Sequence, residues 1–492
     1  MSVLRKLAGQ TAIYGVSSIV ARFLNYLLLP LYTAQFAFGP ADYGVITALY
    51  AWTAFLNVVL TYGMETTFFR FTNKHSDKAD RTYATATFTL VITSALFMLL
   101  GGSFAGHLAD GIGYPLHGFS VLMLVGIISI DAVTTLPMAR LRSQNRPWKF
   151  AAINVASVVV NVVLNVFYIG YCMRHVAQGR TNALIEAVYD PSLGVGYVFL
   201  INLVSSSFKL LLLLPSFPKW RLGIDRKLLG SMLLFGAPLL VAGLAGMVNE
   251  TADRLLLKHL LPADTADAQI GIYGACYKLA ILITLFIQAF RMGAEPFFFS
   301  HAREPNSTRT FARIMNVFVA VCMSAFLLVM LFLDVFKHLI RNPAFWPGLK
   351  VVPILLLANV FLGIYYNQSV WYKVTDRTRW GGWIAIFGAV VTLVLNYGLI
   401  PRIGYMGSAW ATFICYASMA IVSYALGQRY WPVPYDLGRI LLYMGGGVVL
   451  WGGVEVAGLS GAVGYGLRAL VLIGYLMFAW RTERSARRPL ST

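Results

Sequence analysis

The chain has 492 residues, of which 58% are hydrophobic and only 12% are charged. A soluble domain carries about 25% charged residues, so this composition excludes an ordinary soluble protein. The formal net charge is +19, but the basic residues lie in short loops between apolar runs. That pattern is typical of a membrane protein and argues against a nucleic-acid partner. The four cysteines show no CxxC spacing, so they predict neither a disulfide framework nor a metal site.

The apolar runs predict an all-α polytopic membrane protein. A bilayer core needs about 20 apolar residues per helix, and the period-2 alternation of a membrane β-barrel is absent. The basic N-terminus runs into a full-length apolar span without an obvious cleavage site, which favours a first helix over a removed signal peptide. The fourteen expected spans are residues 9–37, 42–68, 83–106, 117–140, 149–173, 193–216, 229–260, 269–292, 311–333, 349–372, 380–400, 406–427, 436–456 and 461–480.

The basic residues gather in alternate loops, and this pattern predicts the orientation. Most of the 39 Lys and Arg fall on one side, namely Arg5, Lys6, Arg70, Lys74, Lys78, Arg81, Arg140, Arg142, Arg146, Lys149, Lys219, Arg221, Arg226, Lys227, Arg303, Arg309, Arg313, Lys373, Arg377, Arg379, Arg429, Arg439, Arg481, Arg484, Arg487 and Arg488. The positive-inside rule then places both termini in the cytoplasm, which requires an even number of spans. Fourteen spans satisfy this requirement, and twelve would also if the last two, Gly-rich spans did not both cross.

A short motif occurs twice along the chain. Residues 63–69 read GMETTFF and residues 293–299 read GAEPFFF, and the same sequence offset relates the Tyr-Gly pairs at 43–44 and 273–274. Six spans separate the copies, so both enter the membrane in the same direction. Parallel repeats of this kind build two lobes around a central path, with chance matching of apolar sequence as the alternative.

Several short stretches occur in a characteristic order and spacing, namely residues 29–33 (LPLYT), 42–44 (DYG), 136–142 (LPMARLR), 145–147 (NRP), 236–239 (GAPL), 253–257 (DRLLL), 271–274 (GIYG), 277–278 (YK) and 396–401 (NYGLIP), with Gly404 and Gly407. Together they resemble the polysaccharide-transporter branch of the multidrug/oligosaccharidyl-lipid/polysaccharide flippase superfamily. The resemblance implies about fourteen transmembrane helices, two pseudo-symmetric six-helix lobes in a V, and transport of polyprenyl-linked sugars. We therefore expect an N-terminal lobe at 1–216, a C-terminal lobe at 217–430, and two additional helices with a basic cytoplasmic tail at 431–492.

Three cations inside predicted spans are candidates for binding the cargo. Arg22 lies near the middle of the first span, Arg254 in the seventh and Lys278 in the eighth. A charge within the bilayer normally faces a cavity or a partner, and a lipid-linked pyrophosphate is an anion that cations bind. We expect these three side chains to be headgroup ligands in a central cavity. The alternative is a structural ion pair or snorkelling to the interface.

Other charged residues in the spans have less specific patterns. Glu250, Arg254 and Lys258 share one helix face near the periplasmic end of the seventh span, which suggests a solvated outer mouth. Arg254 is also well placed to pair with Glu250. Arg291 and Glu295 are i, i+4 neighbours, and we expect a local ion pair.

Polar residues in the fourth to sixth spans offer further candidates. Asp131 is either an ion-coupling carboxylate or, as we favour, the partner of a cation on a neighbouring helix. Lys209 is close enough to the interface to snorkel. Asn154, Asn161 and Asn165 line one side of the fifth span, where interhelical hydrogen bonding is favoured over contact with sugar.

The sequence contains neither GxxxxGK[ST] nor HExxH. These absences predict a chain that is not an enzyme, needs no cofactor or metal, and hydrolyses no ATP. Transport would then be driven by an ion gradient, the membrane potential or consumption of the product on the far side.

Together these features favour a flippase of the bacterial inner membrane. Its expected cargo is an undecaprenyl-pyrophosphate-linked oligosaccharide, moved from the cytoplasmic to the periplasmic leaflet for O-antigen, capsule or exopolysaccharide synthesis. Membrane lipid and the polysaccharide polymerase with its chain-length machinery are the expected partners. A lipid II flippase, a cation-coupled multidrug exporter and a non-transporting scaffold are the alternatives. The first span contains Arg22 and no acid, which favours an anionic cargo.

Overall fold

The computed structural model describes Gly15, Ser17 and residues 19–74, 76–219, 223–302, 304, 306–458 and 461–485. The described residues form helices, turns and loops and contain no strand, which confirms the predicted all-α class. Within them, thirteen helices are long and apolar enough to cross a membrane. Their ranges are Pro40–Lys74, Ala79–Ser103, Pro115–Ser143, Pro147–Ala177, Gly196–Ser216, Arg226–Leu260, Ala263–Phe299, Ser307–Leu331, Pro343–Val374, Arg379–Ile403, Tyr405–Tyr430, Leu437–Ala457 and Gly461–Arg484.

These thirteen helices correspond one to one with the second to fourteenth predicted spans. The first predicted span begins outside the described residues, and its described part contains the shorter apolar helix Ile19–Tyr32. The last two spans, which the sequence left open, are both long and apolar enough to cross. The predicted set of about fourteen spans therefore agrees with the fold wherever the chain is described.

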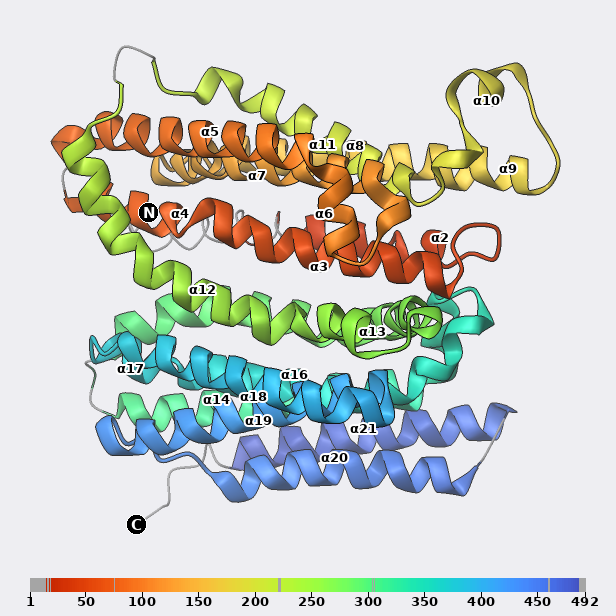
Figure 1. The fold of residues 1–492 in the computed structure, drawn as a ribbon. Coiled ribbons are helices and arrows are strands. Elements are labelled where there is room, and N and C mark those ends of the chain that lie inside the picture. The colour runs from red at the N-terminus through yellow and green to blue at the C-terminus, as the bar shows by residue number, and fades with distance from the viewer. Residues whose placement is uncertain are drawn as a thin grey trace. The chain divides into compact units, whose positions relative to one another are not determined.

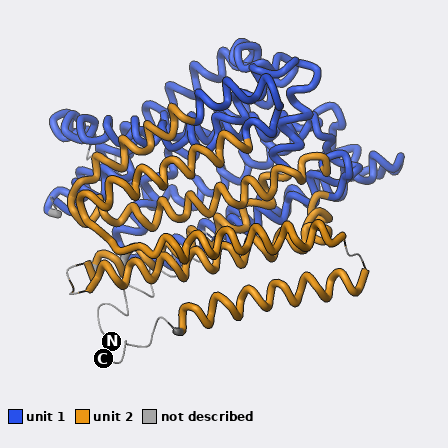
Figure 2. The backbone as a smooth tube through the Cα atoms, turned by 90° about the horizontal axis from the view of Figure 1, so that it is seen from below, with its two compact units in different colours: residues 1–275, 341–345, 392–408 blue, residues 276–340, 346–391, 409–492 orange. Residues whose placement is uncertain are grey.

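The chain packs into two compact units, which Figure 2 shows in blue and orange. Unit 1 comprises residues 1–275, 341–345 and 392–408, and unit 2 comprises residues 276–340, 346–391 and 409–492. The division cuts the long helix α13 (Ala263–His301), whereas the lobes expected from the repeat meet near residue 217. Packing and repetition are different criteria, so the lobe boundaries stay a prediction.

Helix α7 lies at the centre of unit 1 and packs against α5 and α11, while α11 packs on α8 and α12 on α3 (Figure 1). The described helices that lie wholly in this unit are α2 (Leu29–Tyr32), α3 (Pro40–Thr61), α4 (Met64–Lys74), α5 (Ala79–Ser103), α6 (Ala105–Gly111), α7 (Gly118–Ser143), α8 (Pro147–Asn165), α9 (Arg174–Ala177), α10 (Ala183–Val188), α11 (Gly196–Leu213) and α12 (Arg226–Leu260). A π-helical stretch, Val166–Met173, continues α8. Proline begins α3 and α8, and the Asp225 carboxylate caps α12 by accepting hydrogen bonds from two main-chain N–H groups.

Helix α14 is the most buried span of unit 2. The helices that begin in this unit are α14 (Ser307–Leu331), α15 (Leu333–Phe336), α16 (Val352–Gln368), α17 (Val370–Val374), α18 (Arg379–Ile403), α20 (Leu437–Ala457) and α21 (Gly461–Ser485), and α19 (Tyr405–Tyr430) enters it at residue 409. α14 packs against α16, α20 and α21. The Tyr443 hydroxyl donates to the buried Glu483 carboxylate at 2.8 Å, which joins α20 to α21. Both C-terminal spans are therefore packed parts of this unit.

Glycines allow α3 and the first turns of α13 to cross in close contact within unit 1. A Cβ added to Gly44 would overlap the main-chain oxygen of Asp267, and one added to Gly271 would overlap that of Pro40. A Cβ on Gly274 would come within 2.7 Å of the Thr47 side chain. Small residues are the usual means by which membrane helices approach this closely. Gly44 and Gly274, which the repeat equates, thus lie at the same crossing.

The two copies of the repeated motif make equivalent contacts, each inside its own unit. Phe68 is buried and packs on Tyr83, with ring centroids 5.8 Å apart. Phe298 is buried in the same way and packs edge-on against Phe311 at 4.7 Å. Similar ring packing at positions related by the repeat is what an internal repeat would produce, and the repeat itself stays a prediction.

Candidate functional site

Arg22 and Lys278 are both exposed side chains in apolar stretches of the chain. Lys278 is exposed although Cys276 and Leu279 beside it are fully buried, so it occupies the open edge of a packed helix. Arg22 belongs to unit 1 and Lys278 to unit 2. Each is therefore described within its own unit, and their convergence on one cavity stays a prediction.

Arg254, the third candidate ligand, is nearly buried in α12 and is held by neighbouring groups. Its guanidinium lies 3.5 Å from the Asp253 carboxylate and donates a 2.5 Å hydrogen bond to the Glu250 carbonyl oxygen. The Tyr273 hydroxyl donates to the other Asp253 oxygen at 2.7 Å. Asp253 is thus an acidic partner of Arg254, and the Glu250 main chain contributes a further contact. These contacts favour a structural role, and binding of a headgroup by Arg254 stays a prediction.

Lys258 lies at the end of α12 in a largely buried ion pair with Asp267. The Lys258 ammonium is 2.8 Å from one Asp267 oxygen and 2.9 Å from the other, and it lies 4.1 Å above the Tyr114 ring. The Tyr114 hydroxyl donates to Asp267 at 3.0 Å. Burial raises the pKa of this hydroxyl and the Asp267 carboxylate raises it further, so Tyr114 stays protonated. Of the two residues expected at an outer mouth, only Glu250 is exposed, and Lys258 is not in open solvent.

Asp131 on α7 is bound to α11. Its carboxylate accepts a 2.9 Å hydrogen bond from the Ser206 hydroxyl on α11. Lys209 lies about one turn further along the same helix. The hydrogen bond joins the two helices, while an ion pair with a cation and an ion-coupling role for Asp131 both stay predictions.

The asparagines on one side of α8 take part in hydrogen bonds within this helix and, for Asn165, with a neighbouring helix. Asn165 is fully buried, and its amide oxygen accepts a 2.7 Å hydrogen bond from the Tyr32 hydroxyl on α2. Its amide nitrogen donates to the main-chain oxygen of Asn161 at 2.8 Å. Asn154 accepts a hydrogen bond from Ser157 through its main chain. Interhelical bonding thus accounts for Asn165, and sugar contact remains a prediction for Asn154 and Asn161.

The glutamate of each repeated motif binds a cation on a later helix of the same unit. Glu65 pairs with Arg142 at the end of α7. Glu295 pairs with Arg291 at 2.8 Å, as expected, and also with Lys373 on α17 at 2.7 Å. Residues 142 and 373 are related by nearly the same offset as the two motifs. The two copies of the motif therefore share an ion pair with a later helix, although the motif itself does not identify the cation.

Comparison with known proteins identifies the family and the fold. Residues 7–302 match the model of a family described as polysaccharide biosynthesis protein. No curated protein matches the chain. Among solved structures, the lipid II flippase MurJ in its inward closed conformation superposes with a TM-score of 0.76 at 12% identity, covering 97% of this chain and 100% of MurJ.

Multidrug transporters share the architecture. An inward-facing MATE family transporter of the MOP superfamily has a TM-score of 0.62 at 14% identity, covering 86% of this chain and 95% of its own. The MATE multidrug transporter DinF-BH, solved in a complex, has a TM-score of 0.65 at 13% identity, covering 88% and 97%. At these identities the likeness establishes the fold and leaves the cargo open.

Proposed function

The chain belongs to the polysaccharide biosynthesis protein family, and on this premise we propose that it is a flippase for a lipid-linked oligosaccharide. The proposed cargo is an undecaprenyl-pyrophosphate-linked unit, carried from the cytoplasmic to the periplasmic leaflet of a bacterial inner membrane. The carried unit would then be used by a polysaccharide polymerase and its chain-length machinery. Both termini would lie in the cytoplasm, as the distribution of basic residues predicts.

The observation that supports an anionic cargo is the contrast between cations and acids in the spans. Arg22 and Lys278 are exposed cations. Of the acids discussed above, Asp131, Asp253 and Asp267 accept hydrogen bonds or form ion pairs, while Glu250 is exposed toward the end of α12. A carrier of cationic drugs needs an accessible acid in its path. Accessible cations instead suit a pyrophosphate, which Arg binds through its planar fork and Lys as a point charge.

The proposed mechanism uses these cations as a binding site and involves no covalent chemistry. In transporters built from repeats, the cargo binds near the bilayer midplane and the halves rock around it. Arg22 and Lys278 would offset the cost of bringing a charged headgroup to that depth, because an unpaired charge in hydrocarbon is expensive. The sugars would remain in an aqueous path while the polyprenyl chain stays in lipid.

A lipid II flippase is the second candidate, because MurJ shares the fold and lipid II carries the same pyrophosphate linkage. The headgroup chemistry does not separate the two cargoes, and the family description favours the polysaccharide precursor. The sugars attached to the pyrophosphate therefore decide between them. The expected specificity is for a repeat-unit oligosaccharide over the peptidoglycan precursor.

The direct test is transport by the purified chain in proteoliposomes. Polyprenyl-pyrophosphate-linked oligosaccharide, lipid II and a cationic rhodamine dye should be compared as cargoes, with protein-free vesicles as the control. We expect translocation of the oligosaccharide lipid at least tenfold above the protein-free rate, and no movement of the cationic dye. Faster movement of lipid II would support the second candidate, and movement of the dye alone would refute a lipid-linked cargo.

A further inference from the structure

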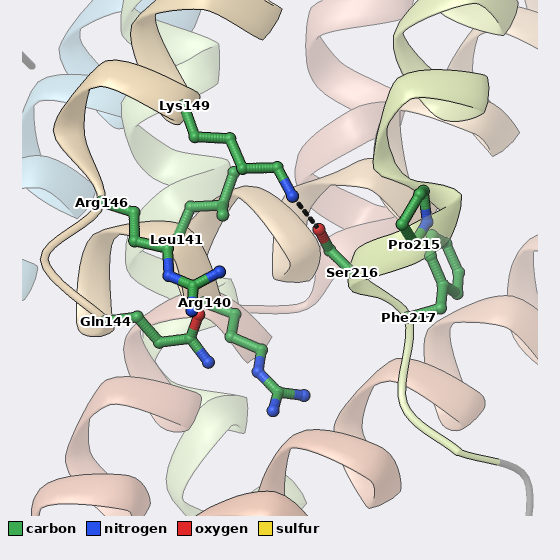
Figure 3. A pocket seen from close by; sticks show the side chains of 8 residues that line it. All are labelled: Arg140, Leu141, Gln144, Arg146, Lys149, Pro215, Ser216 and Phe217. Atoms are coloured by element: carbon green, nitrogen blue, oxygen red, sulfur yellow. Dashed lines mark hydrogen bonds between the residues drawn. The ribbon is translucent and has the colours of Figure 1, made fainter.

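A cationic cavity of about 240 Å³ lies at one end of unit 1, where α7 ends, α8 begins and α11 ends (Figure 3). Its lining consists of Arg140, Leu141, Gln144, Arg146, Lys149, Pro215, Ser216 and Phe217. Figure 3 shows the Lys149 side chain extending across the cavity, where its ammonium donates a 3.4 Å hydrogen bond to the Ser216 hydroxyl. Three of the eight lining residues are cations and none is an acid, so the cavity is suited to an anion.

The positive potential of this cavity has two sources, which are the cations of its lining and the start of helix α8. Arg140 is partly neutralised by the exposed Asp80 at 2.7 Å, but Arg146 and Lys149 are exposed and have no acidic partner among the lining residues. The cavity also lies at the N-terminus of α8, which begins with Pro147 and has no side-chain cap. The positive end of the helix dipole therefore lies beside the cavity.

The surroundings of the cavity place it at the level of lipid headgroups. Three membrane spans, Pro115–Ser143, Pro147–Ala177 and Gly196–Ser216, end beside it. Trp148 is 74% exposed next to the cavity, and tryptophan is enriched where a membrane meets water. Leu211 is 62% exposed on the adjoining turn of α11, so an apolar surface continues from the cavity along the helix.

The volume of the cavity and its position at the ends of the spans distinguish it from a cargo-binding site. Pockets that enclose a drug-sized ligand measure about 300–1,000 Å³, so this smaller cavity can hold a phosphate headgroup but not an oligosaccharide unit. A carrier of this architecture binds its cargo near the membrane midplane, whereas this cavity lies at the span ends. The charge pattern predicts that this end faces the cytoplasm, where the leaflet is rich in anionic lipid.

We propose that this cavity binds the headgroup of a resident anionic glycerophospholipid. Its phosphate would lie between Arg146, Lys149 and Ser216, and its acyl chains would run along α11 past the exposed Leu211. The bound lipid would connect α7, α8 and α11 at their charged ends. This site is separate from the proposed function, and it would exist whichever cargo the chain carries.

The test is titration of the full chain in detergent with dioctanoyl-phosphatidylglycerol, followed by native mass spectrometry. We expect Arg146→Gln/Lys149→Gln to weaken binding at least tenfold, because two charge-assisted contacts are lost. The matched control Arg226→Gln/Lys227→Gln removes the same charge from the exposed start of α12 and should change binding less than twofold. Dioctanoyl-phosphatidylcholine, with the same chains and a zwitterionic headgroup, should bind at least tenfold more weakly.

A second variant keeps the proposal testable if the charge variant fails to fold. Gln144→Trp fills the cavity from an exposed position without changing its charge, and it should weaken phosphatidylglycerol binding as strongly as the charge variant. Unchanged binding in both variants would overturn the proposal, as would an equal loss in the α12 control. Geranyl pyrophosphate tests the other source of a lipid phosphate. Tighter binding of that compound, lost in the same variants, would assign the cavity to the transport substrate and also overturn the proposal.

Discussion

Two pairs of cations in unit 1 differ in how their charge is balanced. In α12, Arg254 and Lys258 are nearly buried, and each lies against an aspartate and a tyrosine ring. At the start of α8, Arg146 and Lys149 are exposed and line a cavity that contains no acid. Each group is a pair of cations about one helical turn apart, so the sequence alone does not separate them.

The difference shows where a membrane protein tolerates uncompensated charge. Breaking a buried ion pair is strongly destabilising because it leaves one charge without a partner in a low-dielectric region. At the membrane surface water and lipid phosphates solvate the cation, so no protein partner is needed. Among the candidate headgroup ligands, Arg254 therefore resembles the buried pair in α12, whereas the side chains of Arg22 and Lys278 are exposed.

The largest expected effect is an all-or-none difference in thiol labelling, which tests on which side of the membrane each end of the spans lies. Single cysteines at Lys78 and Arg146 should be shielded from a membrane-impermeant thiol reagent added outside intact spheroplasts, and cysteines at Gly179 and Asp264 should react. All four positions are exposed, and the four native cysteines are buried and should give no background. Labelling of the first pair from outside would reverse the orientation. A cysteine at Arg303, expected to be shielded, lies outside the described residues.

Removal of Asp267 should have the largest effect on stability. Asp267→Asn leaves the Lys258 ammonium largely buried without its counter-charge, at a cost of about 3 kcal/mol of unfolding free energy. The thermal midpoint in detergent should fall, and less protein should accumulate in the membrane. Lys258→Met/Asp267→Leu should restore most of the loss, since neither charge remains. Failure of the double variant to recover would mean that the pair contributes more than charge balance.

The glycine crossing beside that pair should give the next largest effect. Gly271→Ala forces a methyl group against the Pro40 main chain, and overpacking of this kind costs about 1–3 kcal/mol. Gly246→Ala on α12, where a Cβ meets no atom within 4 Å, is the matched control and should be neutral or slightly stabilising. Equal thermal midpoints for the two variants would show that the helices do not cross as closely as described.

The smallest expected effect on stability concerns Asp131. Asp131→Asn keeps an oxygen that can accept the Ser206 hydrogen bond, so we expect a loss of about 1 kcal/mol or less. Transport and protein abundance then separate two roles. A structural pair predicts that activity per molecule is retained, while loss of transport at normal abundance would identify an ion-coupling carboxylate.

The sequence predicted the helices much better than their contacts. Apolar length is sufficient to locate spans, and the thirteen described spans agree with the predicted ones. The partners of Arg254 and Lys258 were missed because membrane helices are apolar on most faces, so periodicity does not define which face meets a neighbour. Asp253 is adjacent to Arg254 in sequence, where helical side chains do not normally face each other. Asp267 belongs to the next helix, and only the fold brings it to Lys258.

For the candidate site, the sequence predicted which charged residues lie within the spans, but not which groups they contact. Arg22 and Lys278 are charged residues in apolar spans, and the sequence alone identifies both. The repeated GxExxFF motif was visible, but its ion pairs with Arg142 and Lys373 were not. Those cations lie about 80 residues further along the chain near the ends of α7 and α17, where several other basic residues follow, so no spacing rule selects them.

The most direct test of the central claim is the charge dependence of flipping at Arg22 and Lys278. Each charge-assisted contact to a pyrophosphate contributes roughly 1.5–3 kcal/mol, which corresponds to about 10- to 150-fold in binding. Flipping of the oligosaccharide lipid should be measured in proteoliposomes for Arg22→Ala and Lys278→Ala, with Arg22→Lys and Lys278→Arg as charge-preserving controls. We predict a loss of at least tenfold in the alanine variants and partial activity in the controls. Wild-type rates in both alanine variants would contradict the claim that these cations carry the headgroup.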